Sequence, residues 1–177
     1  EIYQIGSVEE LYGFAGIVNA AMYNITPFCG MLTADIQLNE PGQTENILTW
    51  IPIKNFDGTF DGQGHTISGL YRKKARDKDT PLDPNLGFFA NISNIDALHP
   101  TRIRNLKITD ATFMNVTNVG TLVGEIDSLS KEVIIENCEI KSTLGDTAYS
   151  TGSRGGLVGL HHGGILNIRT SSAEPVI

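Results

Sequence analysis

The sequence predicts an all-β fold with one N-terminal capping helix, a right-handed parallel β-helix of three to four coils. Two interleaved sets of similar segments support this prediction. The first set comprises Ile67-Ser68-Gly69-Leu70, Ile103-Arg104-Asn105-Leu106, Ile135-Glu136-Asn137-Cys138 and Ile165-Leu166-Asn167-Ile168, at spacings of 36, 32 and 30 residues. The second comprises Gly87-Phe88-Phe89-Ala90, Thr121-Leu122-Val123-Gly124 and Gly156-Leu157-Val158-Gly159, at spacings of 34 and 35 residues. A shared period of this length indicates stacked structural repeats.

The bulk composition fits one soluble domain with a sizeable core. The chain has 177 residues, of which 40% are hydrophobic and 19% are charged. The net charge of −7 argues against binding to nucleic acid, whose phosphates attract Lys and Arg. No apolar run reaches the ~20 residues that cross a bilayer, and no signal-peptide pattern is recognised. We therefore expect neither a nucleic-acid partner nor membrane insertion.

Residues 7–23 are predicted to form the one helix. Ser7 and Glu10 have the spacing of a capping box, and Asn24 and Pro27 are expected to end the helix. The apolar side chains that fall on one face are Leu11, Phe14, Ala15, Val18, Ala21 and Met22. Gly13 and Gly16 weaken the helix by about 1 kcal/mol each. Such a helix covers the open end of a solenoid, so residues 1–27 are expected to cap a β-helix of residues 28–177.

After Pro27 the chain is predicted to form strands and turns. Residues 30–38 and 50–53 are expected to be strands. In the segment 56–67, the side chains of Phe56, Phe60 and Ile67 are expected to point inward, while Asp-Gly pairs turn the chain. Alternation of apolar and charged residues in Leu106-Lys107-Ile108 indicates strands with one buried and one solvated face.

Equivalent residues of successive coils should stack in columns, because each strand of a β-helix pairs with the coils above and below. The alignment predicts an aliphatic column of Ile67, Ile103, Ile135 and Ile165. It predicts two more columns, Phe88 with Leu122 and Leu157, and Phe89 with Val123 and Val158. One of these last two is expected to point outward or lie at a bend. Asn105, Asn137 and Asn167 are expected to form an asparagine ladder that satisfies the backbone at a corner.

A leucine-rich repeat is the main alternative. Ile103, Leu106, Ile108 and Ala111 match its leucine spacing. The leucine-rich period is about 20–29 residues with a helical return, whereas this period is longer and the return contains glycine-rich strands. The period therefore favours the β-helix.

Three stretches between the two sets of repeats are predicted to project from one flank of the solenoid, since they occupy equivalent slots. They are residues 72–85, 109–119 and 142–153. Aromatic and arginine side chains are favoured at binding surfaces. The candidate ligand-binding residues beside these stretches are Tyr71, Arg72, Tyr149 and Arg154.

Two groups of residues could suggest catalysis or metal binding. Asp57, Asp61 and His65 are read as two Asp-Gly turns with an adjoining histidine rather than as an acid/base cluster. His161 and His162 are neighbours on a strand and point to opposite faces, so they chelate poorly together. No zinc-peptidase, nucleophile-elbow or P-loop motif occurs in the sequence. We therefore predict no catalytic residue, no metal site and no cofactor.

Cys29 and Cys138 do not form a paired metal or redox motif. Cys138 occupies the repeat position of Leu70, Leu106 and Ile168, which predicts a small buried apolar residue. A disulfide between the two cysteines is the alternative.

These motifs resemble the GLUG family of bacterial proteins. Gly156-Leu157-Val158-Gly159 is similar to the GLUG motif, and Thr121-Leu122-Val123-Gly124 is a variant of it. The lead-in segments Trp50–Ile53 and Phe56–Ile67, the Ser7 helix and the stretch Leu32–Ile36 are also similar to such proteins. The resemblance covers nearly the whole chain. It implies a secreted or cell-surface bacterial protein, adhesin-like in many members, and such segments also accompany IgA1-peptidase-like enzymes.

The function expected from the sequence is a non-enzymatic adhesin-like module that binds a host or environmental glycan or protein, or serves as a stalk. The alternative is an accessory, non-catalytic β-helix region of an IgA1-peptidase-like metallopeptidase. A carbohydrate-active β-helix enzyme is the third hypothesis. An uncapped last coil would expose strand edges, so end-to-end association through the C-terminal coil is also expected.

Overall fold

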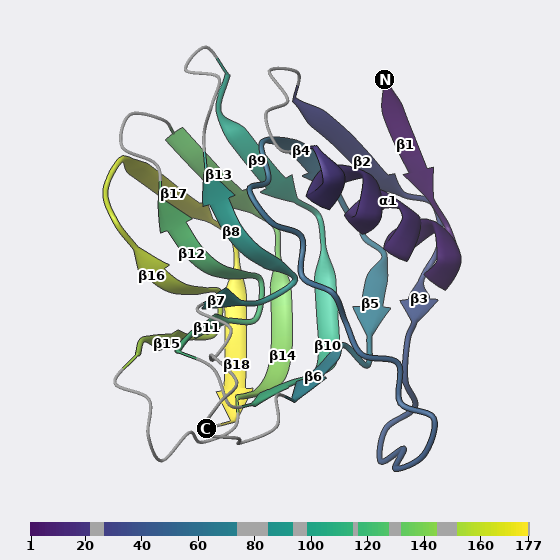
Figure 1. The fold of residues 1–177 in the computed structure, drawn as a ribbon. Coiled ribbons are helices and arrows are strands. Elements are labelled where there is room, and N and C mark those ends of the chain that lie inside the picture. Colours follow the sequence, from purple (N-terminus) through teal and green to yellow (C-terminus); the bar gives the residue numbers. More distant parts are fainter. Residues whose placement is uncertain are drawn as a thin grey trace.

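The predicted parallel β-helix is confirmed, with about four turns and one helix at its N-terminal end (Figure 1). The computed structural model describes residues 1–21, 27–73, 85–93, 99–114, 117–127, 132–144 and 152–176. All strand pairs in this part of the chain are parallel. In Figure 1 the coils follow one another from the purple N-terminal strands to the yellow C-terminal strands.

Two six-stranded sheets make up the larger walls. The first, here called sheet A, has the order β1-β2-β4-β9-β13-β17. Its strands are β1 (Ile2–Ile5), β2 (Phe28–Leu32), β4 (Gly58–Asp61), β9 (Thr101–Arg104), β13 (Glu132–Glu136) and β17 (Ile165–Arg169). The second, sheet B, has the order β18-β14-β10-β5-β3, and β6 also pairs with β10. Its strands are β3 (Ile36–Gln37), β5 (Thr66–Ser68), β6 (Tyr71–Lys73), β10 (Lys107–Met114), β14 (Glu139–Leu144) and β18 (Ser172–Val176).

Two three-stranded sheets complete the coils that begin with β4, β9 and β13. One contains β7 (Asn85–Leu86), β11 (Asn118–Gly120) and β15 (Arg154–Gly155). The other contains β8 (Phe89–Ser93), β12 (Val123–Asp127) and β16 (Val158–His161). The coils therefore return through strands in the described residues, which excludes the helical return of a leucine-rich repeat.

The helix α1 (Val8–Ala20) covers the N-terminal end of the solenoid. Ser7 is its N-cap, and the Ser7 hydroxyl accepts a hydrogen bond from the Glu10 backbone N–H at 3.2 Å. The Glu10 carboxylate reaches back to the Gly6 N–H at 2.7 Å, one residue before the usual capping-box partner. The helix is shorter than the predicted 7–23, and residues 22–26, including Met22 and Asn24, lie outside the described part.

Aromatic side chains join the helix to the first coils. The Phe14 ring lies 5.8 Å from the Phe60 ring and 6.5 Å from the Phe56 ring, measured between centroids. Trp50 is fully buried and stacks on Phe88 at 5.2 Å with an interplanar angle of 6°. Phe56, Phe60 and Ile67 all point into the core, as predicted. The helix thus caps the core by inserting Phe14 among rings of the first two coils.

The aliphatic column predicted for sheet A is half right. Ile103 and Ile135 are backbone partners, and the column continues to Phe60 on one side and to Ile168 on the other. Ile165, which was predicted to stack on Ile135, instead pairs with Glu132 and is 62% exposed. The register of β17 is therefore shifted by three residues from the predicted one, so that Ile168 pairs with Ile135. The sequence offers an isoleucine at both positions, and the pairing of the whole strand decides between them.

Ile67 was also predicted to belong to the column of Ile103 and Ile135, but it belongs to a different column. It lies in sheet B, where it pairs with Ile36 and Ile108. The same column continues through Ile140 to Ala173. The motif Ile67-Ser68-Gly69-Leu70 therefore resembles the corner motif of later coils by sequence but occupies the next wall of the solenoid.

Both columns of the glycine-rich motif point inward, so of the two expected alternatives, an outward column or a column at a bend, the structure has the bend. Phe89, Val123 and Val158 are register partners, and backbone hydrogen bonds link Leu122 to Leu157. Phe88, Phe89, Leu122 and Val123 are fully buried. The bend between the two short sheets lets consecutive residues both face the core, since the chain changes direction between them.

Glycine is needed at this bend because backbones approach closely. A Cβ atom on Gly124 would lie 2.6 Å from the Ala90 carbonyl oxygen and 2.7 Å from the Leu86 nitrogen. A Cβ on Gly159 would lie 2.6 Å from the Gly124 oxygen. The repeated glycine therefore marks contact between two walls of the solenoid.

Some predicted segments differ in detail. The stretch 30–38 is divided into β2 and β3, and residues 50–53 form only one isolated bridge, from Ile53 to Phe89. The slot 109–119 is mostly strand, because β10 runs to Met114. Each of the three connections leads from sheet B to β7, β11 or β15. Residues 74–84, 115–116 and 145–151 lie outside the described part of the chain, so the projection of these stretches from one flank stays a prediction.

The last coil exposes apolar side chains on β17 and β18. Ile165, Ile168 and Val176 are 62%, 46% and 66% exposed. Association of two copies through this coil stays a prediction. Among the residues described, no helix has the length and apolar character to cross a membrane.

Candidate functional site

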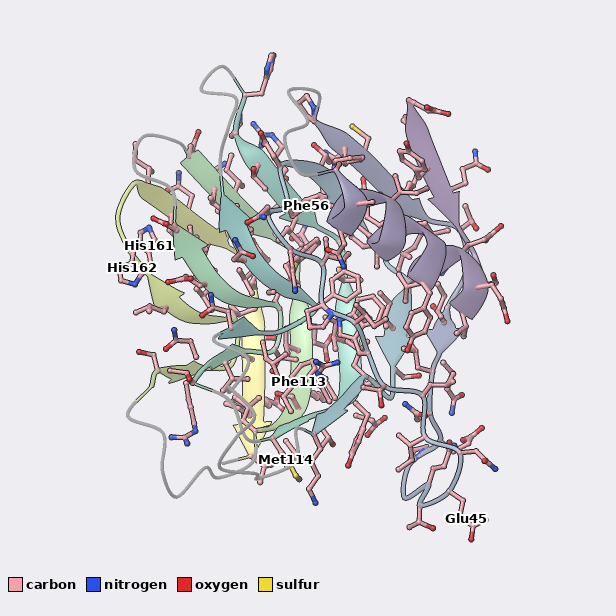
Figure 2. All side chains as sticks on the ribbon, in the orientation of Figure 1. Glu45, Phe56, Phe113, Met114, His161 and His162 are labelled. Carbon is pink, nitrogen blue, oxygen red and sulfur yellow. The ribbon has the colours of Figure 1, made fainter. Side chains whose placement is uncertain are left out.

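A groove of about 600 Å³ runs over the outer face of sheet B. Its floor is formed by residues 69–71, 110, 112, 141–143 and 174–176, which belong to or adjoin β6, β10, β14 and β18. One wall is the loop after β3, which contributes residues 39–43 and Ile47. In Figure 2 this loop projects beyond the body of the solenoid, with Glu45 near its tip.

Strand register places one row of side chains along the groove. Thr112 pairs with Tyr71 on one side and with Thr143 on the other, and Thr143 pairs with Val176. Their neighbours Phe113 and Leu144 are buried, so this row points to the outer face. Neighbouring strands lie about 4.8 Å apart. The row therefore presents a tyrosine, two threonine hydroxyls and a valine at regular spacing across four strands.

The loop wall is held by its own hydrogen bonds. The buried Asn39 amide donates to the Leu48 and Gly69 carbonyls at 2.9 and 2.7 Å and accepts from the Leu48 N–H at 2.8 Å. Gln43 accepts from the Glu40 N–H at 2.9 Å and donates to the Glu45 carbonyl at 2.9 Å. These contacts fix the wall against the sheet, so the groove is preformed.

Among the described residues, three carboxylates and one ammonium group line the groove. They belong to Glu40, Asp110, Glu174 and Lys141. Lys141 Nζ lies 3.9 Å from Glu174 Oε2 and 3.7 Å from Glu139 Oε1. Asp110 is at a β-bulge, where β10 carries two residues between Ile108 and Ala111 and β14 carries only Lys141. Its φ of 53° is left-handed, a conformation that Asp tolerates better than most residues.

The four candidate residues from the sequence do not form one site. Tyr71 lines the groove. Arg72, the next residue on β6, faces the other side and lines a separate pocket of about 260 Å³. Arg154 on β15 pairs with Val119 and lines neither cavity, while Tyr149 lies outside the described residues. Asp110, Lys141, Glu174 and the Asn39 loop were missed, because only the coil register shows that they face the same groove.

Asp57, Asp61 and His65 are separate, as the structural interpretation of that segment expected. Asp57 accepts a hydrogen bond from the Thr101 hydroxyl at 3.1 Å. His65 Nδ1 lies 3.2 Å from the Asp35 carboxylate. The pKa of Asp35 is held below its ordinary value by hydrogen bonds from the Thr66 N–H and then from His65. The three side chains thus contact different partners and form no common acid/base cluster.

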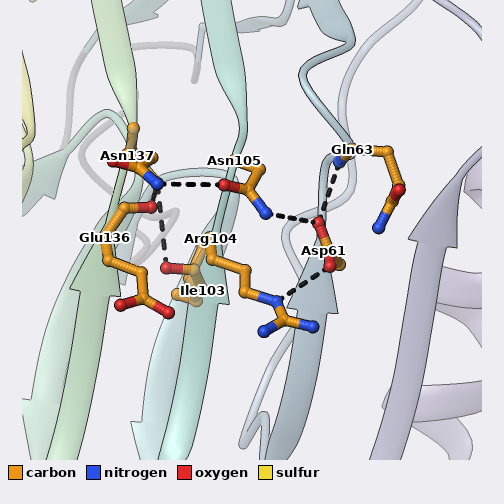
Figure 3. Close-up of polar contacts among 8 residues, drawn as sticks. Asp61, Gln63, Ile103, Arg104, Asn105, Glu136 and Asn137 are labelled. Atoms are coloured by element: carbon orange, nitrogen blue, oxygen red, sulfur yellow. Dashed lines mark hydrogen bonds and ion pairs between the residues drawn. The ribbon is translucent and has the colours of Figure 1, made fainter.

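Asp61 anchors a corner of the solenoid (Figure 3). Its carboxylate accepts from the Gln63 N–H at 2.9 Å, Asn105 Nδ2 at 3.0 Å and Arg104 Nε at 2.8 Å. Burial raises the pKa of Asp61, but these hydrogen bonds and the Arg104 charge outweigh it, so the pKa lies below its ordinary value. The expected asparagine ladder exists between Asn105 and Asn137. It continues from Asn105 to Asp61 in the preceding coil.

Asn167 is not part of the ladder, which corrects that prediction. It pairs with Ile134 on the backbone, and its amide donates to Glu132 Oε1 at 2.5 Å. The corner position after β17 is occupied by Thr170, whose φ of 47° matches those of Asn105 and Asn137 at 53° and 52°.

The histidines and cysteines show no shared ligand geometry in the part of the chain described. His161 and His162 lie at one edge of the solenoid (Figure 2), and His162 Nε2 is 3.2 Å from Glu125 Oε1. No group of three or more His, Cys, Asp or Glu side chains there could hold a metal ion. Cys29 and Cys138 are both free thiols, so the alternative disulfide is wrong. Cys138 is buried beneath the corner, and burial raises its pKa to about 11.

No family model matches the chain, and no curated protein or solved structure matches it. The resemblance to the GLUG family therefore stays a prediction from the sequence motifs.

Proposed function

We propose that the chain is a non-enzymatic, secreted or cell-surface β-helix module of the adhesin-like kind, and that it binds a glycan in the groove over sheet B. The observation that carries the proposal is the preformed groove with its row of Tyr71, Thr112 and Thr143. Hydroxyl and amide groups can donate and accept hydrogen bonds, which suits the hydroxyl groups of a sugar. An aromatic ring beside them offers an apolar surface to a sugar ring.

The size of the groove favours a small ligand over a protein. Its volume of about 600 Å³ falls within the range of roughly 300–1,000 Å³ for small-molecule sites. A stable protein interface buries about 800 Å² on each partner and is centred on aromatic or Arg anchors. Tyr71 is the single aromatic residue that lines the groove in the described structure. A short stretch of oligosaccharide fits these dimensions better.

The test is a glycan-array screen with the whole chain, followed by titration of each glycan that binds. Thr143→Val removes one groove hydroxyl while keeping a β-branched side chain of similar size. Thr59→Val on β4 is the matched control, since Thr59 lies on sheet A and does not line the groove. We expect Thr143→Val to weaken binding by about tenfold, the value of one neutral hydrogen bond near 1.4 kcal/mol, and Thr59→Val to leave it unchanged. Absence of glycan binding, or equal effects of both variants, would contradict the proposal.

A carbohydrate-active enzyme is the second candidate, and the carboxylates in the same groove favour it. Glycoside hydrolases use two carboxylic groups on either side of the scissile bond, and Glu40, Asp110 and Glu174 line this groove. Release of new reducing ends from a bound glycan, abolished by Asp110→Asn with binding retained, would support an enzyme. Binding without product release would support the module.

A further inference from the structure

We propose that the glycan bound in the groove over sheet B is an extended β-1,4-linked chain. It lies lengthwise along the solenoid axis, with one sugar unit over each of the strands β6, β10, β14 and β18. The inference rests on the proposed function and deepens it, since it names the class of glycan for the same groove. The direction of the groove, the spacing of its polar groups and the wall at one end carry the inference.

The groove follows the solenoid axis, because successive coils contribute equivalent residues to it. The contributions are residues 69–71, 110 and 112, 141–143 and 174–176, one group from each coil. Backbone register aligns these groups, since Thr112 pairs with Tyr71 and with Thr143. Thr143 in turn pairs with Val176 on β18. The four strands of the floor span three spacings of about 4.8 Å, or about 14 Å in all. A ligand that fills this groove is therefore elongated along the axis.

A second row of polar groups lies beside the row of Tyr71, Thr112 and Thr143. Lys141 pairs with Glu174, and Asp110 lies in the bulge opposite Lys141. All three charged side chains line the groove and are exposed. Carboxylates accept hydrogen bonds, and ammonium groups donate them, so both suit sugar hydroxyl groups. Each of the strands β10, β14 and β18 thus places one charged side chain on the groove floor.

This spacing matches a straight sugar chain. A pyranose unit in an extended chain is about as long as the spacing of neighbouring strands, about 4.8 Å. Successive units would therefore meet polar groups on successive strands. A β-1,4 linkage keeps the rings in a nearly straight ribbon, whereas an α-1,4 linkage curves the chain away from a straight row. The Tyr71 ring offers an apolar surface to the face of one sugar.

The floor of the groove offers side chains to a ligand, because its backbone groups are used within the sheet. The strand β10 pairs with β6 and β14, and β14 pairs with β10 and β18. An extended peptide binds a sheet by adding a strand to an unpaired edge, whereas this groove lies over the face of paired strands. Sugar hydroxyl groups bind side chains and need no edge, which favours a glycan over a peptide.

The loop after β3 closes one end of the floor. The Asn39 amide donates to the Gly69 carbonyl at 2.7 Å. Gly69 has a φ of 70°, and a Cβ atom there would collide with the Asn39 backbone. The loop is therefore in direct contact with the coil of β5 and β6, and the site begins at Tyr71. From there to β18 the floor of about 14 Å has room for about four sugar units.

The experiment measures affinity as a function of chain length. The whole chain is titrated by calorimetry with cello-, manno- and chito-oligosaccharides of one to six units, and with malto-oligosaccharides of the same lengths. We expect at least one β-1,4 series to bind, with affinity rising by about tenfold or more from the disaccharide to the tetrasaccharide. Affinity should then stay level up to the hexasaccharide, and the curved malto-oligosaccharides should bind more weakly. A library of random hexapeptides is screened in parallel.

Variants at the two ends of the groove test whether the chain lies lengthwise. Tyr71 on β6 and Glu174 on β18 are three strand spacings apart, about 14 Å, too far for one sugar unit to contact both. Tyr71→Phe and Glu174→Gln should therefore each weaken tetrasaccharide binding by about tenfold. Glu136→Gln is the matched control, since Glu136 lies on β13 in sheet A and does not line the groove. A circular-dichroism melt establishes that each variant is folded.

The outcomes separate this inference from the proposed function. Affinity that stops rising at the disaccharide, equal binding of malto-oligosaccharides, or loss in only one of Tyr71→Phe and Glu174→Gln would overturn the lengthwise chain alone. Equal loss in Glu136→Gln would do the same. Binding of other glycans on the array, or of peptides, without any β-1,4 series would also overturn it. Absence of binding to every glycan on the array would overturn both this inference and the proposed function.

Discussion

Asn137 Nδ2 donates a hydrogen bond to Asn105 Oδ1 at 3.2 Å, across one coil of the solenoid. Both residues adopt a left-handed backbone, with φ of 52° and 53°. Each is followed by a buried residue, Cys138 or Leu106, which points into the core. The asparagine therefore turns the chain between sheets A and B and links one coil to the next.

Replacement of Asn105 separates these two contributions. Asn105→Ala should lower the free energy of unfolding by about 2–3 kcal/mol, because it loses hydrogen bonds to Asp61 and Asn137 and adds a left-handed penalty of roughly 1–2 kcal/mol. Asn105→Gly loses the same hydrogen bonds without the backbone penalty and should be less destabilised. Urea unfolding measures both variants. If alanine were as stable as glycine here, the left-handed corner would be wrong.

The lowered pKa of Asp61 predicts a pH dependence of stability. A carboxyl group whose pKa is depressed on folding adds stability above its unfolded pKa, and that contribution is lost as the pH falls through the folded pKa. The free energy of unfolding should therefore drop below the ordinary Asp pKa of 3.8 more steeply in the wild type than in Asp61→Asn. Urea unfolding between about pH 6 and pH 2 provides the comparison. Parallel curves for the two proteins would show that Asp61 does not contribute this dependence.

Two glycines should respond in opposite directions to alanine. Gly124→Ala should destabilise the chain by about 1–3 kcal/mol, since its Cβ would meet the backbone of Leu86 and Ala90. Gly13→Ala should stabilise it by up to about 1 kcal/mol, because Gly13 lies in α1 with no atom within 4 Å of a new Cβ. Thermal unfolding ranks the two variants. A neutral Gly124→Ala would argue against close contact of the two walls.

The two thiols should differ in reactivity. Cys138 is buried with its pKa raised to about 11, so almost none of it is thiolate at pH 8. Cys29 is half-buried and should be modified first. We expect a thiol reagent to label Cys29 readily in the native protein and Cys138 only after addition of denaturant. Mass spectrometry of peptides assigns each label, and rapid native labelling of Cys138 would contradict its place beneath the corner.

The sequence specified the architecture better than the register. Repeats with inward Ile, Phe and Leu and glycine at bends predicted stacked parallel strands, and the columns of Phe89, Val123 and Val158 were confirmed. Ile165 was placed wrongly because Ile168 lies three residues later, and the motif alone does not distinguish them. Thr170 at the last corner lacks the asparagine signal that marks Asn105 and Asn137.

The site was less accessible to sequence analysis than the fold. Tyr71 was identified from its place beside one of the stretches between the repeats, and it lines the groove. Asp110 could not be aligned, because the bulge in β10 adds one residue that its partner strand lacks. The Asn39 loop belongs to an irregular first coil and has no counterpart in the repeat. Tyr71 and Arg72, which the sequence analysis had grouped together, are consecutive residues of β6, so their side chains point to opposite faces of the strand and line different cavities.

The most direct test of the account is a cross-link between register partners on the groove floor. Thr112 and Thr143 are Cα partners in β10 and β14, and neighbouring strands are close enough for a disulfide, whose Cα atoms lie about 4.4–6.8 Å apart. Thr112→Cys with Thr143→Cys should cross-link under mild oxidation, as detected by mass spectrometry. Thr112→Cys with Glu139→Cys, which is offset along β14, should not. Cross-linking of the offset pair in place of the register pair would contradict the stacking on which the groove depends.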